Sequence, residues 1–148
     1  MNATLEKKNK TMISVTSVTD NYILQPTLLS KHKKTLEWLS TAMLWKWELA
    51  FFQKLLDRYV SKFSSVDDKK KIDHFQNVIT YYRYELIDAL TARLRSHEKK
   101  LAEMLETKDE TKTDCLKEHE GLMNDIEAAN VQFLQNKEEL FEFIEKAI

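Results

Sequence analysis

Three of the four histidines are spaced so that a bundle of helices could bring them together. His97 and His119 fall on the apolar stripes of two predicted helices, and His32 lies one turn before the stripe of a third. Neutral imidazole is a good donor to Zn²⁺ or a similar ion, and neighbouring imidazoles repel one another once they are charged. His32, His97 and His119 are therefore candidate metal ligands or a candidate pH-sensitive cluster. Three unrelated, half-exposed histidines near helix ends are the favoured interpretation.

The single cysteine offers a different chemistry. Cys115 precedes His119 by one helical turn, so the two could form a nucleophile pair, but a small buried cysteine beside a hydrogen-bonded histidine is the favoured interpretation. The chain lacks the Glu-x-x-His pairs of di-iron bundles, the second histidine of His-Glu-x-x-His, and a glycine-rich phosphate loop. We therefore expect no catalytic residues, no enzyme activity and no cofactor.

Composition and charge narrow the function classes further. The net charge is −1, and residues 98–148 carry seven basic and fourteen acidic residues, which disfavours nucleic-acid binding there. One cysteine, no signal-peptide-like start and no long apolar run predict a cytoplasmic protein that does not enter the membrane. The expected partner is another protein or a second copy of the chain, and a second copy would give a homodimer.

The elements that position these residues are few and long. From Thr27 to Ile148 the chain holds one glycine, Gly121, and no proline, so it has few places to turn. The expected fold class is all-α: an up-down-up antiparallel three-helix bundle, with a flexible tail at 1–26 and helices at about 30–63, 67–106 and 111–147. Ser65 with Asp68, and Thr107 with Glu110, resemble capping boxes at the two turns.

The apolar stripes of each helix predict its buried side. The first helix has two adjacent stripes, and the second has one stripe whose phase shifts between Ala89 and Leu90. The third has two clean heptad columns. The first-helix stripes are Leu36, Leu39, Met43, Trp47, Ala50, Leu55 and Trp38, Ala42, Trp45, Leu49, Phe52, Leu56, Val60; the third-helix columns are Cys115, Leu122, Ala129, Asn136, Phe143 and His119, Ile126, Phe133, Leu140, Ala147.

The turn positions predict which residues share a layer. Trp47 should face Tyr84, which in turn should face Asn136, so that aromatic residues gather in mid-bundle around one partly buried, hydrogen-bonded amide. This layer is expected to be filled core, with a pocket for a flat ligand as the alternative. The full set is Trp45, Trp47, Tyr81, Tyr82, Tyr84 and Asn136. Trp38, Phe51, Phe141 and Ile148 lie at or beyond the edges of the stripes and predict an exposed interface.

Several segments resemble small, uncharacterised all-helical bacterial proteins. They are Leu36-Glu-Trp-Leu, the run from Trp45 to Leu56, His97-Glu-Lys-Lys-Leu-Ala-Glu and Glu118-His-Glu-Gly-Leu. The resemblance covers roughly residues 30–148 and rests on residues common in helical bundles. It implies a bundle fold and no known activity or site. The first functional hypothesis is therefore a non-catalytic interaction or structural module, and the second is a ligand- or metal-binding sensor.

Overall fold

The protein is built from helices alone in the part that the structure describes. A computed structural model describes residues 19–109 and 113–148, with side chains from residue 27 onward, and this part contains no β-strand. The all-α prediction is confirmed. The elements are α1 (Thr19–Tyr59), the 3₁₀ turn η1 (Val60–Lys62), α2 (Val66–Tyr81), the π-helical turn η2 (Tyr82–Leu86), α3 (Ile87–Thr107) and α4 (Thr113–Glu145).

The first helix begins earlier than predicted. α1 starts at Thr19 and runs through Pro26, whereas the sequence prediction ended the tail at residue 26 and began the helix near residue 30. Proline removes one backbone hydrogen bond and strains the preceding turn. In α1 that local penalty does not end the helix, so a single proline was a poor boundary signal. The rest of the predicted tail, residues 1–18, lies outside the described residues.

The first turn forms where the sequence placed it. α1 is followed by η1, and Phe63 is extended before α2 begins at Val66. The Ser65 side chain accepts a hydrogen bond from the Asp68 backbone N–H at 3.1 Å, which satisfies one of the free donors at the start of α2. The predicted cap by Ser65 is therefore confirmed.

The second turn forms differently from the prediction. α3 ends at Thr107, and Lys108 takes the left-handed conformation that closes many helices, with φ of 57°. Thr107 does not cap the next helix, because its Oγ1 donates to the Glu103 carbonyl at 2.9 Å within α3. The expected box of Thr107 with Glu110 is wrong for Thr107, and Glu110 lies outside the described residues.

A π-helical turn shifts the buried side of the second rod. Buried residues recur every three or four positions along α2 and α3, except for the five-residue step from Tyr82 to Ile87. The turn η2 spans this step, and its wider loop takes up the extra residue so that both halves keep their apolar side inward. The predicted phase shift is present, but it lies one to two turns before Ala89.

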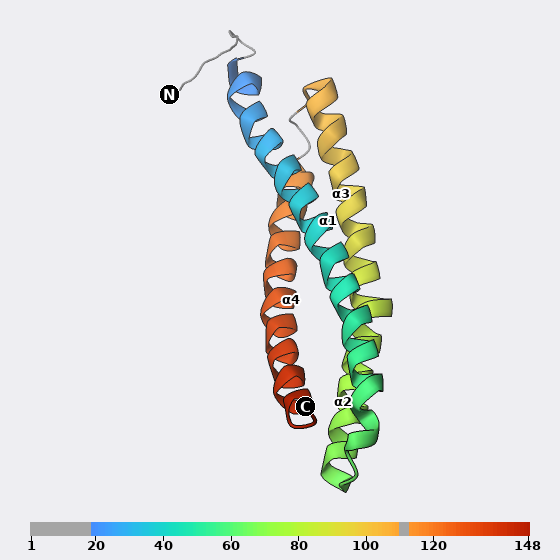
Figure 1. The fold of residues 1–148 in the computed structure, drawn as a ribbon. Coiled ribbons are helices and arrows are strands. Elements are labelled where there is room, and N and C mark those ends of the chain that lie inside the picture. The colour runs from blue at the N-terminus through green and yellow to red at the C-terminus, as the bar shows by residue number, and fades with distance from the viewer. Residues whose placement is uncertain (1–18, 110–112) are drawn as a thin grey trace.

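Ion pairs at the surface connect the helices to one another. Figure 1 shows α1 beside the rod made of α2, η2 and α3, with α4 alongside. Lys46 pairs with Asp88 at 2.6 Å, Arg93 with Asp125 at 2.8 Å, and Lys137 with Glu48 at 2.9 Å. The pairs between α1 and α3, and between α3 and α4, lie within one turn of the layers that the sequence predicts.

The core divides into a long main cluster and a small cluster near one end. The main cluster follows the second apolar stripe of α1, from Trp38 to Leu56. The small cluster joins Leu28 of α1, Leu101 and Met104 of α3, and Cys115 of α4. Every member of the two predicted α4 columns is buried or half-buried. A polar layer containing two histidines lies between the two clusters along α3 and α4.

The second predicted α1 stripe is buried from Trp38 to Leu56, whereas the first is only partly covered, with Leu39, Ala50 and Leu55 half-buried. Leu36, Met43 and Trp47 of the first stripe are exposed, because α3 and α4 cover a single side of the helix. The predicted facing of Trp47 and Tyr84 inside the core is wrong, since both are exposed, as is Tyr81. Trp38, expected at an exposed edge, is buried instead.

Candidate functional site

Two buried histidines face each other between α3 and α4. His97 continues the buried stripe of α3 after Leu94, and His119 continues that of α4 before Leu122, so the apolar pattern carries both rings inward. His97 is fully buried, at 0% exposure, and the two ring centroids lie 5.1 Å apart. Buried imidazoles at core positions cost stability unless they are hydrogen-bonded, and these two are.

A chain of hydrogen bonds runs through the pair to a carboxylate. His97 Nδ1 lies 2.8 Å from Glu118 Oε1, and His97 Nε2 lies 2.9 Å from His119 Nδ1. A carboxylate only accepts, so Nδ1 of neutral His97 carries the proton and its Nε2 accepts from His119. Lys100 Nζ, 3.4 Å from both Glu118 oxygens, stands at the end of the chain. These partners fix both tautomers.

The same surroundings keep the two rings neutral. Burial lowers the pKa of His97, against the opposing effect of Glu118. Burial, then His97 and Lys31, lower the pKa of His119 to about 4. Burial alone would raise the pKa of Glu118, but the His97 hydrogen bond and Lys100 outweigh it and leave that pKa lowered. At neutral pH this chain of hydrogen bonds therefore links two neutral imidazoles to one ionised carboxylate.

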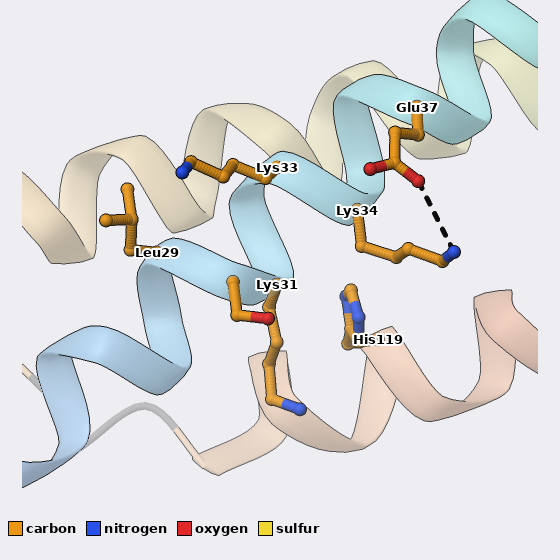
Figure 2. A pocket seen from close by; sticks show the side chains of 7 residues that line it. Leu29, Lys31, Lys33, Lys34, Glu37 and His119 are labelled. Atoms are coloured by element: carbon orange, nitrogen blue, oxygen red, sulfur yellow. Dashed lines mark hydrogen bonds and ion pairs between the residues drawn. The ribbon is translucent and has the colours of Figure 1, made fainter. Parts of the chain in front are cut away.

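The outer side of His119 borders a lysine-lined groove. Its ring packs against Trp38 with centroids 4.8 Å apart. Figure 2 shows the ring reaching from α4 toward α1, where Lys31, Lys33 and Lys34 surround the opening. The groove holds about 480 Å³. Of these lysines, Lys31 contributes to the lowered pKa of His119, after burial and His97.

Cys115 completes a set of possible metal donors. Its Sγ lies 3.8 Å from His97 Nδ1, and one donor atom each of His97, Cys115 and Glu118 lies within 4.8 Å of the others. Cys115 and Glu118 stand three residues apart on α4, so both project toward α3 from one face. The sequence paired Cys115 with His119, and the structure places its thiol beside His97. Cys115 is buried, as the favoured interpretation predicted.

The structure joins two of the three predicted histidines and places the third elsewhere. His32 Nε2 pairs with Glu98 Oε2 at 2.8 Å, one residue beyond His97 along α3. Adjacent helical residues point about 100° apart, so a partner at residue 98 is turned away from the His97 ring. Sequence reasoning named no role for Glu118. Its signal was the three-residue spacing from Cys115 on the face that carries His119.

The mid-bundle aromatic layer is packed. Tyr82 and Trp45 are buried against Phe133, and the space left among the surrounding side chains is only about 20 Å³. Asn136 is half-buried and donates to Tyr82 Oη at 3.2 Å. The expected hydrogen bond of Asn136 is confirmed with Tyr82 in place of Tyr84. The part of the predicted layer around Tyr82 is filled core, whereas Trp47 lines an open groove of about 580 Å³ between α1 and α3.

The outer face of α1 carries an exposed apolar column. Leu29, Leu36 and Met43 recur every seven residues, and Trp47 follows one turn later. Each residue advances the helix by about 100°, so Met43 and Trp47 lie roughly opposite the buried Trp45. All four are exposed, and Trp47 reaches 66%. We call these four residues the α1 column. The predicted exposed residues Phe51, Phe141 and Ile148 are also exposed.

Comparison of the chain with protein-family models, curated proteins and solved structures finds no match. The resemblance to bacterial helical proteins therefore stays a prediction. Among the described residues, no helix combines the length and the apolar character needed to cross a membrane.

Proposed function

We propose that this protein is a non-catalytic, cytoplasmic three-helix bundle that acts through protein–protein interaction, and that its first partner is a second copy of itself. The α1 column supports this proposal. Its heptad spacing is that of a helix which packs on another helix, and the core stripe of α1 already occupies the opposite side. Large apolar side chains that gather on one exposed helix face mark interaction surfaces, and here Lys33 and Ser40 lie between them on that face.

Two features favour a second copy as the partner. A two-fold axis lets the same column meet itself, so one surface suffices for both subunits. The net charge of −1 leaves little repulsion between copies. Neither feature requires a second kind of protein.

The test is the molar mass in solution as concentration rises, measured by sedimentation velocity and light scattering. The wild type is expected to form dimers, and the Leu36→Lys/Met43→Lys variant to stay monomeric. Val131→Lys/Leu134→Lys is the matched control, because it adds the same two charges at exposed apolar residues that lie on α4 instead of the column. A wild type that stays monomeric at all concentrations would refute self-association, and dimers that survive in the Leu36→Lys/Met43→Lys variant would refute the column.

The second candidate function is a metal- or ligand-binding sensor. The cluster of His97, Cys115 and Glu118 favours it, because three potential ligands lie together in a polar layer of an otherwise apolar core. A variant that loses metal binding but dimerises like the wild type would separate this function from the first.

A further inference from the structure

We infer that His97, Cys115 and Glu118 form a binding site for Zn²⁺ between α3 and α4. The three side chains supply one imidazole nitrogen, one sulfur and one carboxylate oxygen, all within 4.8 Å of one another. This mixed donor set suits a borderline-soft divalent ion and suits Mg²⁺ or Ca²⁺ poorly, since those ions prefer oxygen alone. This site differs from the set of three histidines that the sequence suggested.

The distances are close to those of a tetrahedral site. Ligand bonds of about 2.0–2.3 Å place donor atoms roughly 3.3–3.5 Å apart around Zn²⁺. His97 Nδ1 is now 2.8 Å from Glu118 Oε1 and 3.8 Å from Cys115 Sγ. Side-chain shifts of about 1 Å bring the set to the required spacing. Three protein donors leave a fourth position for water.

Charge and protons balance on binding. The Cys115 thiol gives its proton to solvent, so a thiolate and the Glu118 carboxylate together neutralise the ion. The metal takes the place of the proton between His97 Nδ1 and Glu118. His97 Nε2 gains the proton that His119 Nδ1 now donates, and His119 takes up one at Nε2. The imidazole pair keeps its two protons, and one proton is released per ion bound.

His119 acts as the positioning residue of this site. Metal-bound histidines usually donate their second ring N–H to a neighbouring acceptor, which fixes the tautomer. His119 Nδ1, 2.9 Å from His97 Nε2, is that acceptor once the metal is bound. Lys100 acts in the opposite direction, because its ammonium lies 3.4 Å from Glu118 and competes for the carboxylate.

The direct experiment titrates the full-length reduced protein with Co²⁺ and Zn²⁺. Co²⁺ is expected to give a sulfur-to-metal charge-transfer band together with the intense visible bands of tetrahedral cobalt, and Zn²⁺ to remove both. Zn²⁺ should bind one per chain with a dissociation constant of about 1 μM or lower, measured by competition with a chromophoric chelator. Calorimetry in buffers of different ionisation enthalpy should show release of one proton. Absence of the thiolate band, or only millimolar binding, overturns the proposal.

Variants separate this site from other metal-binding surfaces. Cys115→Ser and Glu118→Gln should each weaken Zn²⁺ binding about 100-fold or more, and His119→Asn about 10- to 100-fold. Lys100→Ala should strengthen it up to about fivefold. Glu120→Gln, an exposed neighbour on α4, is the matched control and should change nothing. Equal binding by the wild type and the Cys115→Ser variant, or loss of binding in a His32→Ala variant, would overturn this donor set.

Discussion

Acidification should destabilise the protein through the buried histidine pair. The pKa of His119 falls from 6.5 in an unfolded chain to about 4 in the folded protein. The unfolded chain therefore takes up a proton first as the pH drops, and stability is lost from about pH 6.5 down to about pH 4. The stabilisation is complete above pH 6.5, where both states are neutral at this residue. His97, whose pKa is also lowered, acts in the same direction.

The size of the effect follows from the shift. One unit of pKa corresponds to about 1.4 kcal/mol. The shift of His119 from 6.5 to about 4 therefore lowers the free energy of unfolding by about 3 kcal/mol at the low-pH limit. At pH 5 the contribution of His119 is about 2 kcal/mol relative to pH 7.5. The pKa of Glu118 is lowered from 4.5, so most of its own contribution appears below this range.

The assay is urea unfolding followed by circular dichroism at pH 7.5 and pH 5.0, with a metal chelator present. The free energy of unfolding should fall by about 2 kcal/mol or more in the wild type. His119→Asn should remove most of that difference, because an asparagine amide can still donate to His97 but does not titrate. His74→Asn changes an exposed histidine and should keep the wild-type pH dependence. A His119→Asn variant with the full pH dependence would refute the reasoning.

Three further changes should alter stability in defined ways. Gly121→Ala should raise the free energy of unfolding by about 1 kcal/mol in urea titrations, because Gly121 is helical and no other group lies within 4 Å of an added Cβ; a destabilised variant would contradict this. Asn136→Leu should lower the free energy of unfolding by about 1 kcal/mol, because the buried Tyr82 hydroxyl loses its hydrogen-bond partner. Adding Tyr82→Phe should recover most of this loss in a double-mutant cycle. Additive losses in the two variants would contradict this prediction. Free Zn²⁺ at 100 times its dissociation constant should raise the free energy of unfolding by about 2.7 kcal/mol in the wild type and by much less in Cys115→Ser; equal gains in both would contradict it.

The sequence predicted α4 well because its apolar residues follow one regular spacing. Both heptad columns are buried or half-buried along their length, and they carry His119 into contact with His97. Ser65 was also predictable, since a cap depends on residues three apart. These features are local, and the backbone geometry of a helix is enough to derive them.

The remaining features depend on contacts between distant residues. α1 has two apolar stripes of similar composition, and only packing against α3 and α4 determines that the stripe with Trp45 is buried and the one with Trp47 is only partly covered. The π-helical turn brings Ile87 into the core five residues after Tyr82. Glu118 reaches His97 from another helix, and its three-residue spacing from Cys115 does not by itself show that His97 lies opposite. His32 pairs with Glu98, the residue after His97 on α3.

Quenching of tryptophan fluorescence tests the proposed interface most directly. Trp38 and Trp45 are buried within the chain, so the emission open to acrylamide comes from Trp47, the last residue of the α1 column. The quenched fraction of the wild type should fall as protein concentration rises through the dimerisation range. A Trp47→Phe variant should show little quenching at any concentration, and Leu36→Lys/Met43→Lys should keep the low-concentration value throughout. Trp47 emission that stays equally open to quencher while the wild type dimerises would contradict the α1 column as the interface.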